Sequence, residues 1–167
     1  TIKYNHLNLP IRIQYSNGNR LEYLYAADGR RLAKTVTPSG TTASNTHYAG
    51  SFVYNDSGLE FVFTSEGRAV PDNGTLRYEY QYKDHLGNTR LAFSDLDGDG
   101  TADATSEIIQ EAHYYPFGME MLGLGTPQVG PEHQFKYNDR ELQAEFDLQW
   151  YSMDYRQLDA QLGRWTS

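Results

Sequence analysis

The sequence contains no cysteine, which excludes disulfide bonds and thiolate metal sites. It has no stretch near the roughly 18 consecutive apolar residues of a transmembrane helix, so we expect no membrane span. Lysine and arginine form no run, and the formal net charge is −8. This charge opposes binding to nucleic acid or to an anionic membrane surface, because both carry negative charge.

The abundant residues are those of strands and tight turns. The 167 residues include 14 tyrosines, 7 phenylalanines and 15 glycines, whereas leucine-rich helical stretches are few. Tyrosine and β-branched residues favour strands, and glycine with asparagine or aspartate favours the turns between them. The length suits one domain with a real core. The composition therefore predicts an all-β domain of consecutive antiparallel hairpins.

Alternation of apolar and polar side chains places the first strands. It predicts strands, joined by Asn/Asp/Gly turns, at residues 7–15, 21–25, 31–36, 47–54 and 59–63. A Ser/Thr/Gly loop is expected at 38–46, and turns at 66–67 and 71–74. Pro10 lies on the polar side of its strand, and a proline there predicts a position at the edge of the sheet.

Residues 78–93 carry the clearest alternation of the chain. The three tyrosines Tyr78, Tyr80 and Tyr82 share one face, opposite Glu79, Gln81 and Lys83. A turn at 84–88 leads to a returning strand that contains Leu91 and Phe93. Because aromatic rings bury well, we expect the tyrosine face to point inward and to build the inner side of the sheet.

The pattern loosens after Gly118. Residues 119–131 are rich in glycine and proline and are expected to form a loop. In 139–146, Asp139 suits a helix N-cap and Leu142 and Phe146 stand at i, i+4, which predicts a short helical turn. Large aromatic residues follow and are expected to fill the core; these are Trp150, Tyr151, Tyr155 and Trp165.

An acidic loop at 95–103, DLDGDGTAD, fits the pattern D-x-D-x-D-G-x-x-D. Ca²⁺ binds six to eight oxygens, and alternate carboxylates supply them while a glycine allows the sharp turn. The twelfth position, a glutamate in an EF-hand, is Ser106, and strands flank the loop. We therefore predict a structural Ca²⁺ loop between two strands; the alternative is a polar hairpin loop that binds nothing. The expected ligands are Asp95, Asp97, Asp99, the Thr101 carbonyl, Asp103 and Glu107.

No catalytic pattern stands out. His85 beside Asp84, with Ser94 nearby, has the residue types of a dyad, but no nucleophile elbow accompanies it, and a turn or packing role is the favoured interpretation. Tyrosine and tryptophan clusters stack on sugars or fill cores, and the core is favoured here. Carboxylates are plentiful, but no pattern locates a glycosidase pair. We expect no enzymatic activity.

Several motifs, in order, resemble RHS repeat-associated core domains. Residues 82–90, YKDHLGNTR, resemble the core signature, and 114–118, YYPFG, the motif that follows it. Residues 25–32 resemble one YD repeat, while 137–142 and 150–165, ending in LGRW, resemble the end of the core. The acidic insertion with the flanking EIIQE and YYPFG is similar to versions from Bacteroidetes-type bacteria.

The resemblance implies a spiralled β-shell of YD repeats. In bacterial members of the family the shell encloses a C-terminal toxin, and the animal relatives are the teneurins, which are adhesion proteins. Many bacterial members cleave themselves through aspartates past the core, which would lie beyond the end of this chain. Leu158 and Ala160 also depart from the usual Tyr-Asp-Pro, and 153–155 from the usual small Gly-Ala.

The resemblance organises the chain as one domain and as a piece of a longer bacterial protein, secreted or displayed on the cell surface. Hairpins like YD repeats occupy 1–77, the core signature with the Asp/Gly loop 78–118, and a C-terminal plug 119–167. The expected function is a non-enzymatic shell segment around a toxin or effector cargo. Its partners would be adjacent YD repeats and the C-terminal cargo domain. The alternative is a calcium-stabilised cell-surface module that binds proteins or glycans.

Overall fold

The computed structural model describes residues 1–124 and 133–166. These residues are almost entirely strands and turns, as predicted. Within them, no helix is long and apolar enough to cross a membrane. The larger sheet has eleven strands in sequence order: β1 (Ile2–Tyr4), β2 (Pro10–Gln14), β3 (Arg20–Tyr25), β4 (Arg31–Thr37), β5 (Ser44–Ala49), β6 (Phe52–Asn55), β7 (Gly58–Phe63), β8 (Gly67–Asp72), β9 (Thr75–Lys83), β10 (Thr89–Phe93) and β11 (Ile108–Glu111).

A second, smaller sheet is made by the C-terminal part of the chain. Its order is β12 (Leu142–Gln143), β13 (Trp150–Ser152), β14 (Gln157–Asp159) and β15 (Arg164–Thr166). All strand pairs of both sheets are antiparallel neighbours in sequence, so the chain is a succession of hairpins. We refer to the larger sheet as the wall and to residues 133–166 as the plug.

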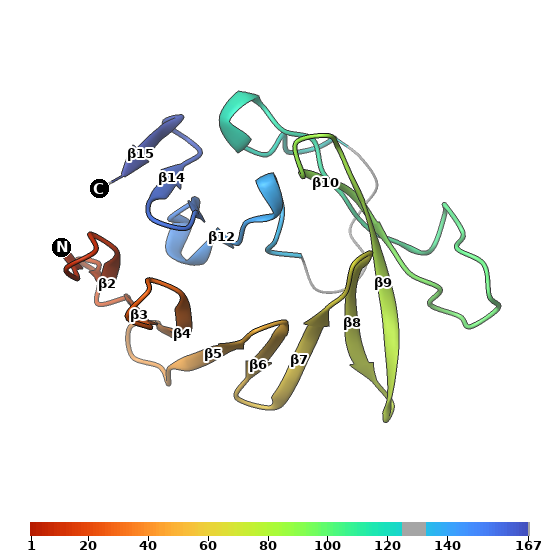
Figure 1. Ribbon diagram of the computed structural model, residues 1–167, viewed down its shortest axis with the longest axis horizontal. Helices are drawn as coiled ribbons and strands as arrows, with labels where there is room; N and C mark the ends of the chain where they lie inside the picture. Colours follow the sequence, from red (N-terminus) through yellow and green to blue (C-terminus); the bar gives the residue numbers. More distant parts are fainter. Residues whose placement is uncertain (125–132, 167) are drawn as a thin grey trace.

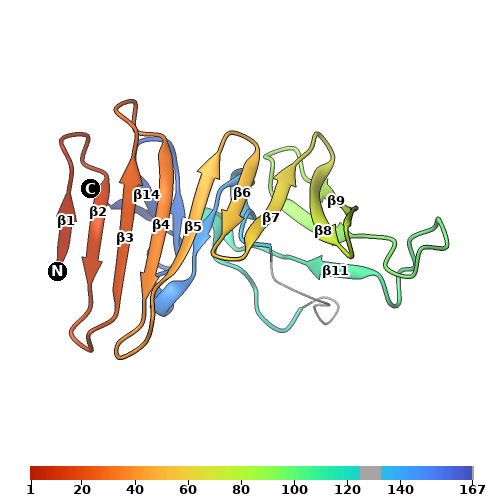
Figure 2. The same ribbon diagram turned by 90° about the horizontal axis from the view of Figure 1, so that it is seen from below.

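The wall is curved, and the plug lies on its concave side. Figure 1 shows strands β2 to β9 following an arc around the C-terminal strands. In Figure 2 the wall strands stand side by side in front and the plug lies behind them. Two apolar clusters mark the core, one inside the plug around Tyr151 and one where the plug meets β2 and β3 around Leu21. The curvature therefore gives the wall an inner face that the plug covers.

Several strand boundaries differ from the predicted ones. The segment expected as one strand at 7–15 is a turn, with Asn8 at φ 58°, followed by β2, and an additional strand, β1, precedes it. Pro10 begins β2 and pairs with Tyr4 beside a bulge, so it is not in an edge strand. The strand expected at 47–54 is split into β5 and β6 by a turn in which Gly50 has φ 64°.

Three further predictions fall on the C-terminal part. The helical turn expected at 139–146 is replaced by β12 between two 3₁₀ turns, Tyr137–Asp139 and Glu145–Asp147. Leu142 packs inside the plug whereas Phe146 packs against the wall, so they do not share one helix face. Tyr155 and Trp165 are exposed, at 71% and 46%, rather than core. The loop expected at 119–131 lies from 125 onward outside the described residues.

Candidate functional site

The inner face of the wall is polar toward β8 and β9, opposite to the prediction. Glu79 is 3% exposed and faces the plug, whereas Tyr82 is 68% exposed on the convex side, together with Tyr78 and Tyr80. The alternation of residues was predicted correctly, but its direction was wrong. Polar side chains take the inner positions because Arg68 of the wall and His133 of the plug give them hydrogen-bond partners there. The contact between wall and plug is therefore the first candidate site.

Glu141, which directly precedes β12 in the plug, is the centre of one buried network. Its carboxylate accepts hydrogen bonds from Arg31 at 2.9 Å and Lys34 at 2.8 Å on β4, and from the Tyr48 hydroxyl at 2.8 Å on β5. Lys34 also donates to Glu145 at 2.6 Å. Burial alone would raise the pKa of Glu141, but the two cations hold it below its ordinary value. The plug is thus attached to β4 and β5 by a charged clasp.

A second buried network joins β8 and β9 to the plug. Arg68 donates to Glu79 at 2.6 Å, and the His133 ring lies 2.8 Å from the same carboxylate oxygen. Burial would raise the pKa of Glu79, but the His133 hydrogen bond and Arg68 lower it to about 2. Between the two networks, Phe135 packs edge-on against Phe61 and Phe63, with ring centroids 6.1 and 4.7 Å apart.

The 84–90 signature acts as a docking turn. The Asp84 carboxylate accepts from the backbone N–H groups of Leu86 and Asn88, each at 3.0 Å, which fixes the turn. The side chain of Asn88 in turn accepts from the Asn138 N–H of the plug at 2.8 Å. His85 is exposed at the tip of this turn. These residues have structural partners, and no contact brings His85 to Ser94, whose hydroxyl donates to the carbonyl of Tyr78.

Two glycines of the RHS-like motifs pack closely against aromatic rings. Gly118, at φ 88°, lies so close to Tyr137 that a Cβ atom would stand 2.6 Å from its ring. Gly163 lies similarly against Phe117, where a Cβ would stand 3.1 Å from the ring. Any larger residue at Gly118 would displace the ring or the turn. The YYPFG motif therefore packs against the plug closely at Gly118, and the LGRW motif of the plug packs against the YYPFG motif at Gly163.

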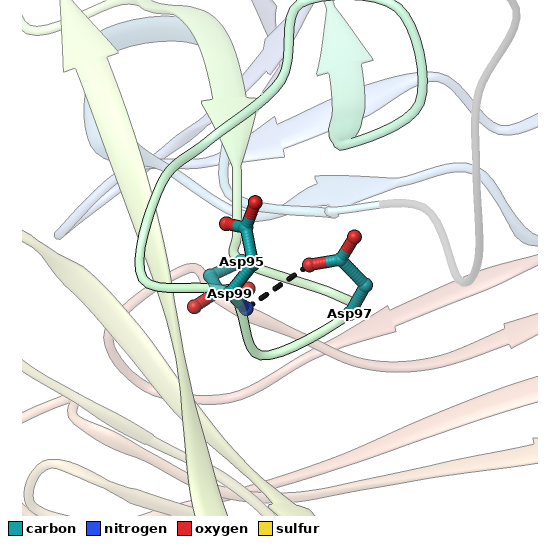
Figure 3. Close-up of side chains that lie close together, drawn as sticks. All are labelled: Asp95, Asp97 and Asp99. Carbon is teal, nitrogen blue, oxygen red and sulfur yellow. Dashed lines mark hydrogen bonds between the residues drawn. The ribbon is translucent and has the colours of Figure 1, made fainter.

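The aspartate loop between β10 and β11 extends past the end of the wall (Figure 2). Asp95, Asp97 and Asp99 each offer a carboxylate oxygen within 4.8 Å of the others (Figure 3). Asp95 already accepts from the N–H groups of Gly98 at 2.6 Å and Gly100 at 2.9 Å, so the loop backbone holds its carboxylate in place. The three oxygens predicted to begin a Ca²⁺ site thus converge.

The remaining predicted ligands are placed differently. Asp103 accepts from Thr105 at 2.7 Å, a bond that lowers its pKa, and it stays outside the trio. Glu107 is buried and accepts from the N–H groups of Leu96 at 2.6 Å and Asp103 at 2.6 Å. Its position fits a residue that organises the loop backbone rather than a direct ligand. Thr101 donates its N–H to Asp99 at 2.8 Å, and its carbonyl as a ligand stays a prediction.

A groove of about 600 Å³ lies on the concave side, between the wall and the plug. Apolar rings and charged groups share its lining, among them Tyr25, Arg31, Phe63, Phe135 and Glu141. Arg31 and Glu141 are already paired with each other there. The groove thus belongs to the same wall–plug contact.

Comparison with known proteins identifies the fold. The sequence matches no family model and no curated protein. The crystal structure of TcdB2-TccC3 is similar to this chain with a TM-score of 0.73 at 20% identity, over 98% of this chain and 9% of that chain. The TcdB2-TccC3-Cdc42 crystal structure gives 0.72 at 22% identity over 98% and 9%. The Photorhabdus luminescens Tc holotoxin pore gives 0.67 at 20% over 98% and 8%.

At these sequence identities, the similarity shows the fold alone. The chain spans less than a tenth of the length of the toxin chains that it matches, with 9% of the TcdB2-TccC3 chain covered. Nearly all of its own residues are included in the alignment, so wall and plug together resemble one part of those chains. In its fold, the described part of the chain therefore resembles a segment of those chains: a curved hairpin wall with a plug on its inner side.

Proposed function

We propose that this chain is a non-enzymatic wall segment of an RHS-type β-shell that encloses or presents a C-terminal toxin or effector domain. The observation that carries the proposal is the alignment of 98% of the chain with the TcdB2-TccC3 structure. The ordered RHS-like motifs support it, because 84–90 and 114–118 lie where wall and plug meet, and Gly163 packs against Phe117 of the second motif. Secretion or surface display follows from the same resemblance.

The shell would act by enclosure. Strands β1 and β11 are the edge strands of the larger sheet, where adjacent YD repeats of the same polypeptide would pair and extend the wall. The plug covers part of the concave face, and the cargo would follow it in the chain. The reading frame on both sides of Thr1 and Ser167 tests this. We expect further YD repeats before and a distinct domain after; a frame without either contradicts the proposal.

Protease protection tests enclosure itself. In the full-length protein, a domain inside the shell should resist a protease that digests the same domain expressed alone. Detergent or denaturant that opens the shell should remove the protection. Equal digestion of the enclosed and isolated domains would contradict enclosure and leave presentation on the outside as the role of the wall.

We also propose that the aspartate loop binds Ca²⁺ and stiffens the β10–β11 connection. The convergence of Asp95, Asp97 and Asp99 supports this, since three close carboxylates repel one another without a cation. Calorimetry should detect Ca²⁺ binding to the unmodified chain and a raised melting temperature. The double change Asp97→Ala/Asp99→Ala should abolish both. Asp28→Ala/Asp139→Ala, which removes two acidic groups elsewhere, should preserve them; no response in the unmodified chain contradicts the proposal.

A calcium-stabilised surface module for glycans or proteins is the second candidate. It is favoured by the outward tyrosines Tyr78, Tyr80 and Tyr82, whose exposed rings are able to stack on sugars. A glycan array separates the two candidates. Binding that a Ca²⁺ chelator and the Tyr80→Ser change both abolish would favour the module, whereas the absence of binding to every glycan would count against it.

A further inference from the structure

His133 ties the plug to two strands of the wall. Its side chain is 1% exposed. The ring Nε2 lies 2.8 Å from Glu79 and Nδ1 lies 3.0 Å from the side-chain nitrogen of Gln81, both on β9. The backbone N–H of His133 donates to the side-chain oxygen of Gln110 on β11 at 2.9 Å. Both ring nitrogens and the backbone N–H of this plug residue are therefore directed to the wall.

The partners define the protonation state that fits. Glu79 is an acceptor, so Nε2 carries the proton and donates it. The Gln81 nitrogen is a donor, so Nδ1 accepts and has no proton. A neutral imidazole thus satisfies both contacts. A second proton on Nδ1 would point at an N–H donor, and the Gln81 side chain would have to turn over or move away.

The charges around the ring also oppose protonation. Glu79 already pairs with Arg68 of β8 at 2.6 Å and with Arg77 of β9 at 3.2 Å, so an imidazolium would be a third cation on one carboxylate. On the plug, buried Lys136 adds positive charge, while β11 contributes the uncharged Gln110. Burial lowers the pKa of His133, and the Glu79 hydrogen bond only partly offsets this.

We propose that His133 is a pH-sensitive latch, which holds the plug against β9 and β11 at neutral pH and releases it in mild acid. The folded chain binds the neutral ring more favourably than the charged one. Stability from this contact is therefore present above the unfolded pKa of about 6.5 and is lost as the pH falls below it. Glu79 stays ionised over this range because its pKa is about 2. A role for the latch in opening a shell around cargo would rest on the proposed function, whereas the latch itself does not.

Hydrogen exchange on the whole chain tests the latch. The amide of Thr89 donates to the Lys136 carbonyl at 2.9 Å and reports directly on the contact between wall and plug. Its protection, corrected for intrinsic exchange, should fall between about pH 7.5 and about pH 5.5, by roughly tenfold for each pH unit between the folded and unfolded pKa values. The amide of Leu21, in the apolar contact of β3, should change less. Unchanged protection at Thr89 overturns the latch.

Two variants and a titration complete the test. His133→Gln should remove the pH response at Thr89, while His85→Gln, which changes an exposed histidine of the signature turn, should retain it. If His133→Gln does not fold, NMR titration of the unmodified chain still decides: a His133 pKa below about 6.5 supports the latch, and one at or above it overturns the latch. None of these measurements requires cargo, so they fail independently of the proposed function.

Discussion

The two ends of the wall hold the plug by different means. At β2 and β3, the buried side chains Ile13, Leu21 and Tyr23 pack against apolar plug residues, namely Phe146, Leu148 and Trp150. Toward the other end the contacts are buried hydrogen bonds. Glu141 of the plug accepts from Arg31 and Lys34 of β4, and Glu79 of β9 bonds to Arg68 of β8 and to His133 of the plug. Apolar burial scales with area and is nearly independent of pH, whereas a buried charge depends on each partner and on its protonation.

The two kinds of contact act differently on the plug: apolar contacts attract it, and polar contacts fix its position. Apolar surfaces tolerate small shifts of the plug, because dispersion and burial have no strong direction. The charged contacts do not, because a displaced carboxylate would be left buried and unpaired. We infer that the apolar end supplies most of the net attraction and that the polar contacts fix where the plug sits. Single substitutions at the two ends should therefore differ in size and in pH dependence.

The largest effect is expected for Glu141→Ala. This change leaves Arg31 and Lys34 buried without their shared carboxylate, which should lower the free energy of unfolding by about 4 kcal/mol. Urea unfolding of both proteins measures the difference. Glu145→Ala is the matched control, because Glu145 contacts Lys34 from a more exposed position and should cost less. Equal losses for the two changes would contradict a central role of Glu141.

The clasp itself was beyond prediction from the sequence. Lys34 and Glu141 are 107 positions apart, and nothing local in the chain indicates that they meet. Period-2 alternation correctly grouped Tyr78, Tyr80 and Tyr82 on one face of β9, since that grouping is a property of any strand. It did not decide which face points inward, because the plug partner that Glu79 and Gln81 share is His133, which is distant in the sequence.

Local features were predicted better. The acidic loop brings Asp95, Asp97 and Asp99 together as expected, because alternate residues of a tight turn converge whatever the rest of the chain does. The role of the Glu107 carboxylate as an acceptor for the loop backbone was not predicted. A glutamate suits a metal ligand and a backbone acceptor equally well, so its residue type does not distinguish the two roles. The helical turn predicted from Leu142 and Phe146 does not form, because positive φ values at 138, 139, 146 and 147 limit the helical conformation to single turns.

A smaller but substantial loss is expected for Leu21→Ala at the apolar end. Leu21 is 0% exposed, and removing its side chain opens a cavity between β3 and the plug. The free energy of unfolding should fall by about 3 kcal/mol. Measured between about pH 5 and about pH 8, this loss should stay constant, because no ionisable group is removed. A loss that changes with pH over this range would remove the distinction between the two ends.

The smallest effect is expected on the outer face. Tyr78 is 53% exposed on β9, next to the buried Glu79, so Tyr78→Thr keeps a good strand residue and should change the free energy of unfolding by about 0.5 kcal/mol or less. Tyr151→Thr, the same substitution at a fully buried position of the plug, should cost about 3 kcal/mol or more. Parallel urea titrations give both values. Equal costs would mean that the outward ring of Tyr78 is packed as tightly as a core ring, so the convex tyrosines would belong to the stability of the wall and would no longer be available as a binding face.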